Sequence, residues 1–178
     1  MSTNSEKRFA KALGCNNMQE VCEKAASWNF NLPEDQHMIR SIILALHANI
    51  EGMLKHILFH HMVRLINEDT YYPDDEPYIQ ELSESIKRLS FSTVLNLLQP
   101  CLNADNHEVF KNLQSINRVR NDVAHRDPDH TSYKNRNPLK DFDSLAELLT
   151  DTTNVHSELG EYFSRKIGLP PDGLLREM

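Results

Sequence analysis

Glycine and cysteine are scarce in this chain of 178 residues, and each shortage excludes a class of architecture. With only five glycines, we expect neither glycine-rich phosphate loops nor many tight turns. Three cysteines without metal-binding spacing fit a reducing compartment better than a disulfide framework. No stretch approaches the ~20 apolar residues of a membrane span, and the first residues lack the apolar core of a signal peptide. We therefore expect a cytoplasmic protein without a membrane partner.

The charge is acidic overall but unevenly distributed. A net charge of −7 argues against a surface made for indiscriminate nucleic-acid binding. Residues 111–140 nevertheless hold seven basic and three acidic side chains, or 7 − 3 = +4, and the remainder carries 12 − 23 = −11. This basic window is either a nucleic-acid contact or a solvated helix end with its loop, because basic residues favour helix C-termini. Both interpretations stay open.

Apolar residues recur at three- and four-residue steps, which is the spacing of amphipathic helices. The longest pattern begins at Leu32-Pro33-Glu34-Asp35, where proline and acids suit a first helical turn, and continues to about Asn67. A helix of that length indicates a bundle, with a face that a second subunit could share. Further helices are predicted at 5–13, 16–28, 78–89, a short segment capped by Ser90 and stopped by Pro100, 107–125 and 140–166.

These patterns predict an all-α protein: a single-domain, up-down helical bundle of about five to seven helices. Residues 1–32 are interpreted as an N-terminal helical extension packed on the bundle, 33–168 as the bundle itself and 169–178 as a C-terminal tail. Polar loops are expected at 69–77 and 127–138.

The string Arg120-Asn121-Asp122-Val123-Ala124-His125 is the most informative part of the sequence. Arg120 falls on or near an apolar helical stripe, and a buried guanidinium needs an anion or several acceptors. Asn121 and His125 are four residues apart and therefore share a helix face, toward which the long Arg120 side chain can swing. A cation, an amide and a titratable imidazole on one patch could hold a phosphate and move a proton beside it.

The string resembles the signature of the HEPN superfamily, the higher eukaryotes and prokaryotes nucleotide-binding domain, in its Arg-Asn-x-x-Ala-His form. The segment Ala48-Asn49-Ile50-Glu51, followed by Leu54 and Leu58, looks like the family's second-helix region, where an acidic residue often faces the site. Ser90-Phe91-Ser92, with Leu95 and Leu98, is similar to the segment that precedes the family's motif helix. The resemblance covers roughly residues 35–165 and implies a HEPN-like helical bundle.

The resemblance implies a metal-independent endoribonuclease, often a toxin or an anti-phage effector. It also implies a homodimer, in which motifs from two chains face one another, and it requires no cofactor. Arg120 would clamp the phosphate oxygens, and His125 would act as general base or acid. Asn121 would orient His125 or donate to the phosphate, and Glu51 would position Arg120 or His125. Cleavage would leave a 2′,3′-cyclic phosphate, and DNA would be inert because it lacks the 2′-OH.

Another interpretation of the same residues is structural. Arg120 could pair with Glu51, and His125 could cap the C-terminus of its helix. The chain would then be a non-catalytic helical module: a regulator, a nucleotide-binding protein, or an antitoxin-bound partner of a nucleotidyltransferase. Exposure of Arg120 and His125 to solvent in a shared cleft would favour the enzyme, and burial of both in satisfied pairs would favour the module.

Other candidates have weaker support. His56 and His60 are four residues apart and could bind a metal, but no further ligand completes the set, so no metal site is predicted. Asp122 and Arg126 are interpreted as a surface ion pair of little energy. Aromatic residues that could stack on bases, or simply anchor loops, are Tyr71, Tyr72 and Tyr133. The basic residues expected to contact RNA are Arg118, Arg126, Lys134 and Arg136.

Overall fold

The computed structural model describes Glu20 and residues 36–67, 77–105, 107–125 and 128–167. These residues form five α-helices and no strand, which confirms the all-α class. The helices are α3 (Gln36–Asn67), α4 (Pro77–Lys87), α5 (Phe91–Asp105), α6 (His107–His125) and α7 (Phe142–Ile167), with a short 3-10 turn, η1 (Pro128–His130). Several predictions lie outside the described residues, apart from Glu20: the helices at 5–13 and 16–28, the helix start at 32–35, Tyr71, Tyr72, Arg126 and the tail.

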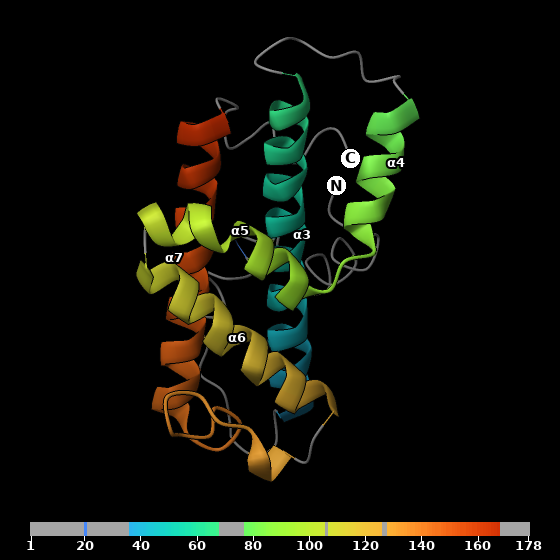
Figure 1. Cartoon of the computed structure of the whole chain (residues 1–178). Helices are drawn as coiled ribbons and strands as arrows, with labels where there is room; N and C mark the ends of the chain where they lie inside the picture. The colour runs from blue at the N-terminus through green and yellow to red at the C-terminus, as the bar shows by residue number, and fades with distance from the viewer. Residues whose placement is uncertain (1–19, 21–35, 68–76, 106, 126–127, 168–178) are drawn as a thin grey trace.

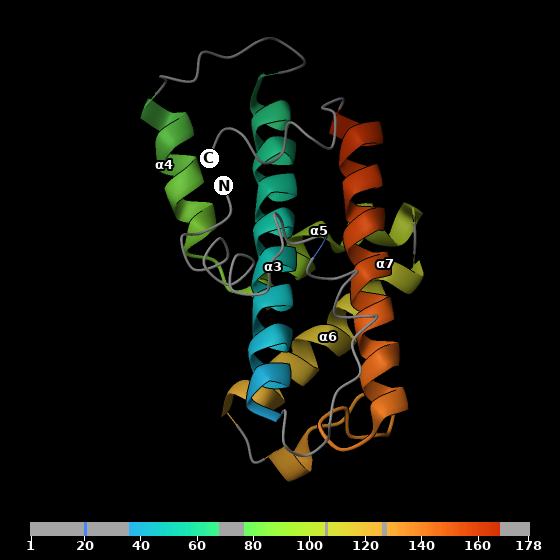
Figure 2. The same ribbon diagram turned by 180° about the vertical axis from the view of Figure 1, so that it is seen from behind.

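The helices form two layers (Figures 1 and 2). In one layer, α3 lies between α4 and α7, and in the other α5 and α6 form an antiparallel pair that crosses this layer obliquely. Both views show α3 and α7 running in the same direction, so the order differs from the simple up-down order predicted. The oblique α5–α6 pair returns the chain to the end where α3 began, and α7 therefore repeats the direction of α3.

The core surrounds α3, which packs against each of the other four helices. A helix enclosed in this way is apolar over more than one face, because every neighbour removes a different strip of its surface from water. Its buried apolar residues are Ile39, Ile42, Ile43, Leu46, Ile50, Leu54, Ile57, Leu58 and Val63.

The same composition makes α3 a candidate membrane span by length and hydropathy. The 28 residues Gln36–Val63 have a mean hydropathy of 1.3 in their most apolar window, 44% of which is buried in the fold. The expectation that no stretch approaches a membrane span does not hold by this measure, because a window average of hydropathy tolerates polar residues between apolar ones. A central helix of a bundle has the same composition, so this is weak evidence for a span.

The predicted helix stop at Pro100 is wrong, because α5 continues to Asp105 with Pro100 inside it. The predicted cap is present, since the Ser90 hydroxyl accepts the Thr93 N–H at 3.2 Å. A proline within a helix removes one N–H, and here the carbonyl that loses its partner belongs to Asn96. Asn96 and Pro100 are both exposed, so water can satisfy that carbonyl. Burial of Leu98 and Leu102 on the opposite face stabilises the helix across the proline.

Candidate functional site

The motif occupies the last turns of α6, whose bounds match the predicted 107–125. Its apolar face is buried against α3, α5 and α7, which fixes the direction of every other side chain on the helix. The buried residues of this face are Val109, Phe110, Leu113, Ile116, Val119 and Val123. The motif side chains therefore stand at the edge of the core rather than on a loop.

Arg120 and Asn121 are joined directly. The Arg120 Nη1 donates to the Asn121 Oδ1 at 3.0 Å. Arg120 is half-buried and Asn121 is exposed, so the amide holds the outer end of the guanidinium near the surface. The Asn121 oxygen contacts Arg120, and the predicted orienting contact with His125 stays a prediction.

His125 is the last residue of α6 and is exposed. A histidine in a final helical turn can interact favourably with the partial negative charge of the helix end when it is protonated. Arg126 and Asp127, which follow it, lie outside the described residues. Asn121 is one turn before His125, and both are open to solvent on α6.

Glu51 lies on α3 and is half-buried. Its carboxylate forms an ion pair with Lys55 at 2.7 Å and approaches the Nδ1 of His47 at 3.9 Å. Lys55 in turn donates to the main-chain carbonyl of Lys87, at the end of α4. The carboxylate is thus held by residues of its own helix, and its predicted positioning of Arg120 or His125 stays a prediction.

His47 is the residue that sequence reasoning missed. It is buried in α3, where its Nε2 lies 3.0 Å from the Asn117 Oδ1 and its ring lies 4.4 Å from that of Phe91. The Asn117 Nδ2 donates to the Ser92 hydroxyl at 3.3 Å, so one chain of contacts joins α3, α6 and α5. The available signal was spacing: His47 is four residues before Glu51, and Asn117 is four before Asn121.

Burial lowers the pKa of His47, and the positive charge of Arg120 lowers it further. The hydrogen bond to Asn117 and the Glu51 carboxylate act in the opposite direction. Of these effects on the His47 pKa, burial is the largest and the Arg120 charge the smallest.

Two of the basic residues expected to contact RNA are paired with acids on α7. Lys134 lies 2.7 Å from Asp151 and 3.0 Å from Glu147, and Arg136 lies 2.7 Å from Glu147. These pairs lower the pKa of Glu147 and raise that of Lys134. Their positive charges are compensated within the chain, while Arg118 is exposed on α6.

The loop after η1 is a tight two-residue turn. Tyr133 and Arg136 exchange main-chain hydrogen bonds of 2.7 and 3.0 Å. Lys134 and Asn135 have φ angles of 45° and 69°, the left-handed values that a type I′ turn requires at both central positions. Tyr133 is buried, which agrees with the loop-anchor interpretation and leaves its ring no open face for a base.

Asp122 corrects a prediction. It was expected to form a surface pair with Arg126. The surface position is wrong, because only 3% of Asp122 is exposed, and the pairing stays a prediction because Arg126 lies outside the described residues. Its position three residues after Val119 and one before Val123 turns it toward the core side of α6, which the surface interpretation overlooked. A buried carboxylate requires hydrogen-bond or ionic partners, so Asp122 contributes to the packing at the base of the motif.

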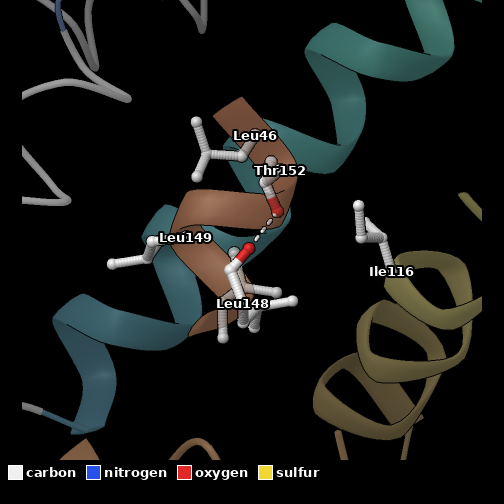
Figure 3. Close-up of a pocket in the computed structure, with 6 residues that line it drawn as sticks. Leu46, Ile116, Leu148, Leu149 and Thr152 are labelled. Atoms are coloured by element: carbon white, nitrogen blue, oxygen red, sulfur yellow. Dashed lines mark hydrogen bonds between the residues drawn. The ribbon is translucent and has the colours of Figure 1, made fainter. Parts of the chain in front are cut away.

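One small cavity lies in the core between three of the helices. A cavity of about 10 Å³ between α3, α6 and α7 is lined by Ile43, Leu46, Ile116, Leu148, Leu149 and Thr152 (Figure 3). The Thr152 hydroxyl already donates to the Leu148 carbonyl at 2.6 Å. A space this small and apolar is a packing defect rather than a binding site.

The histidines of α3 do not assemble into a metal centre. The rings of His56 and His60 lie 4.5 Å apart, edge to face, and both contact the Phe163 ring. Within the described ranges, no three histidine, cysteine or acidic side chains converge on one point. Packing against an aromatic ring accounts for the position of both histidines.

Comparisons with protein-family models, curated proteins and solved structures found no match to this chain.

Proposed function

We propose that the protein is a metal-independent endoribonuclease of HEPN type that binds an RNA phosphate at Arg120 and transfers a proton through His125. The observation that carries the proposal is the openness of the motif: Asn121 and His125 are exposed and Arg120 is only half-buried. Arg120 contacts the neutral amide of Asn121, and no ion pair joins it to a carboxylate among the described residues. Its positive charge is thus available to an anion.

The chemistry requires three tasks. A base removes the proton from the 2′-OH, a cation stabilises the negative charge of the pentacoordinate phosphate, and an acid protonates the departing 5′-oxygen. Arg120 supplies the cation, and its planar guanidinium can bind two phosphate oxygens at once. His125 supplies the proton transfer, and the exposed Asn121 amide can donate to the phosphate or hold Arg120 in position.

In an in-line displacement the attacking 2′-oxygen and the departing 5′-oxygen lie on opposite sides of the phosphorus, so a single His125 does not reach both at once. A second copy of the chain would supply a second imidazole, so a homodimer with facing α6 ends divides the two roles. With this activity, the protein would act in the cytoplasm as a toxin or an anti-phage effector. An antitoxin or a nucleotidyltransferase would control it.

One observation favours a second function, that of a non-catalytic module. Lys134 and Arg136 are neutralised by acids of α7, which reduces the basic surface around the motif. A module that binds a single nucleotide or a protein through Arg120 needs no extended basic track. The two functions differ in turnover.

The test is cleavage of a mixed RNA pool in EDTA by the parent protein and by His125→Ala. The matched control is His107→Ala, which removes an exposed histidine at the opposite end of the same helix, ~27 Å away at 1.5 Å per residue. We expect the parent and His107→Ala to leave 2′,3′-cyclic phosphate ends at similar rates. His125→Ala should be slower by about 10²–10⁴-fold, the usual contribution of an acid–base group.

Equal cleavage by all three proteins would identify a contaminant and contradict the proposal. No cleavage by any of them, combined with RNA binding that is lost in Arg120→Gln, would favour the non-catalytic module. Cleavage of DNA of the same sequence would exclude 2′-OH chemistry.

A further inference from the structure

The solvent face of α6 carries a straight row of polar side chains that ends at the motif. This helix belongs to the layer that faces the viewer in Figure 1. Residues spaced alternately by three and four positions lie on one face of an α-helix. The members of this α6 row are all exposed and none is acidic: Lys111, Gln114, Arg118, Asn121 and His125. At 1.5 Å per residue, the row is ~21 Å long.

The positive charges of the α6 row are not used within the part of the chain that the structure describes. No ion pair there joins Lys111 or Arg118 to an acid. The loop residues Lys134 and Arg136, by contrast, are held by acids of α7. Exposed cations without an acidic partner attract phosphate groups, so α6 offers a phosphate-binding surface that the loop does not.

Few carboxylates lie near the α6 row, although the whole chain has a net charge of −7. Helix α6 contains two acids, Glu108 and Asp122. Glu108 precedes the first member of the row, and Asp122 is only 3% exposed. The antiparallel neighbour α5 has no charged residue before Asp105, its last position. A polyanion lying along the row therefore meets no exposed carboxylate of α6 between Lys111 and His125.

We propose that the α6 row binds a single strand of RNA, with Lys111 and Arg118 contacting phosphates on one side of the phosphate that is cleaved at the motif. This inference rests on the proposed function, because the row leads to the Arg120 and His125 pair. It deepens that function by naming the substrate class, which is RNA with several unpaired nucleotides beside the cleaved bond.

The spacing of the charged members suits a single strand better than a duplex. Lys111, Arg118 and His125 follow one another at intervals of seven residues, or ~10.5 Å along the helix axis. Stacked nucleotides rise ~3.4 Å each, so about three of them span one interval. The phosphates of a rigid duplex wind away from a straight helix, whereas a flexible strand can follow the row along its whole length.

The α6 row is suited to the RNA backbone rather than to the bases. Phe110 is the one Phe, Tyr or Trp of α6, and it is buried, so bases find no aromatic platform on this helix. The Asn121 oxygen accepts from Arg120, which leaves its amide N–H groups and those of Gln114 to donate to phosphate or sugar oxygens. Such contacts carry no sequence information, so binding should depend on strand length and salt.

The first experiment measures binding of a labelled 2′-O-methyl RNA of about twelve nucleotides, a length within the usual range of single-strand sites. This probe cannot be cleaved, because its 2′-oxygen has no proton. Lys111→Gln and Arg118→Gln should each weaken binding about two- to fivefold and reduce the salt slope by about 0.7. The matched control is Arg88→Gln, which makes the same charge change at an exposed position just after α4 and should have little effect.

A substitution that adds charge gives an independent test. Gln114→Glu places a carboxylate between Lys111 and Arg118, where it would both repel phosphate and pair with these cations. Glutamate and glutamine have similar helix propensities, so the helix should be retained. We expect weaker RNA binding than in Gln80→Glu, the same change at an exposed position on α4.

Cleavage kinetics separate a binding role from a structural one. A dinucleotide contains the cleaved phosphate and no flanking phosphate, so the α6 row has nothing further to hold. Lys111→Gln should therefore raise KM about two- to fivefold more for a long unpaired RNA than for a dinucleotide. A general disturbance of α6 would instead reduce kcat equally for both substrates.

The two proposals fail in different ways. If Lys111→Gln and Arg118→Gln bind the probe as the parent does, or lose no more than Arg88→Gln, the inference is overturned. Tighter binding of a duplex of the same length overturns it as well. In either case the ribonuclease proposal stands if the parent still cleaves RNA. If the probe binds along the row but the parent leaves RNA intact, the proposed function fails and the row remains a binding surface for single strands.

Discussion

Tyr133 donates its hydroxyl proton to Asp151 across 2.6 Å, and this contact fastens the loop after α6 to α7. The ring is buried, and Lys134 lies 2.7 Å from the same carboxylate. Burial, together with Asp151, raises the pKa of Tyr133 far above its usual range, so the hydroxyl remains a donor throughout the physiological range. The loop around Tyr133 is thereby held against α7.

Removal of this hydroxyl should destabilise the fold. We expect Tyr133→Phe to lower the free energy of unfolding by about 1–2 kcal/mol, because a hydrogen bond to a carboxylate is lost from a buried ring. Urea unfolding of the parent and the variant measures the difference. Asp151→Asn is the matched comparison: it keeps an acceptor oxygen, so it should cost less than Tyr133→Phe. The reverse order would mean that the Lys134 ion pair dominates.

The turn beside this contact should be sensitive to backbone conformation at Asn135. Its φ of 69° suits asparagine and glycine but strains a β-branched residue. Asn135→Val should lose about 1–3 kcal/mol of stability, whereas Asn135→Gly should stay within about 0.5 kcal/mol of the parent. Because Asn135 is exposed, a loss for valine cannot come from crowding in the core. Equal midpoints in urea for all three proteins would exclude the strained turn.

Replacement of Pro100 is expected to stabilise α5. Pro100→Ala restores a helical N–H for the Asn96 carbonyl and relieves the clash with the proline ring, at an exposed position. The gain is offset in part by the greater freedom of the unfolded chain, so we expect about 1–2 kcal/mol of added stability. Thermal unfolding measures it. A lower melting temperature would indicate that α5 requires the proline's local geometry.

Acid should weaken the fold through its buried histidines. Burial lowers the pKa of His56 to about 4, with repulsion from His60 contributing, and burial also lowers the pKa values of His47 and His156. In the unfolded chain these histidines bind protons near the usual histidine pKa of 6.5, so the stabilisation is complete above about 6.5 and is lost as the pH falls toward 4.

Urea midpoints measured between pH 7.5 and 4.5 test this expectation. His56→Gln should reduce the slope of stability against pH, because one proton-linked group is removed. His37→Gln, at an exposed position on the same helix, is the control and should leave the slope unchanged. A pH-independent midpoint in the parent would contradict the assignment of neutral buried histidines.

Release of the basic loop residues should affect RNA binding. Glu147→Gln removes the carboxylate that pairs with Lys134 and Arg136, so we expect RNA to bind about two- to fivefold more tightly and with a steeper salt dependence. Glu81→Gln makes the same change in net charge at an exposed position on α4 and is the control. Similar effects of the two substitutions would mean that net charge alone matters.

Helical periodicity predicted the described helices well where one face is apolar. The bounds of α6 match the prediction because its buried residues recur every three or four positions up to Val123. Pro100 misled the prediction, because a local rule was applied to a helix that tertiary packing holds together. The parallel course of α3 and α7 was also missed, since periodicity carries no information on how helices cross.

The candidate site was predicted only in part, because helical periodicity describes positions within one helix and not contacts between helices. Spacing along α6 predicts that Asn121 and His125 share a face, and both are exposed there. Contacts between helices are a different matter: His47 and Asn117 are separated by 70 positions, and no local pattern indicates that they meet. The ion pair between Lys134 and Asp151 was likewise not predicted, because the charge composition of a segment does not identify which residues pair.

The place of α3 in the centre of the bundle has a consequence during synthesis. The apolar surface of α3 is fully buried only after α7 packs beside it. Helix α7 begins at Phe142, which is 142 − 67 = 75 positions after the end of α3 at Asn67. At ~5–20 residues per second, a ribosome takes about 4–15 seconds to add that length. Throughout that interval the nascent chain presents a helix apolar enough for chaperones or a membrane surface to bind before its last neighbour exists.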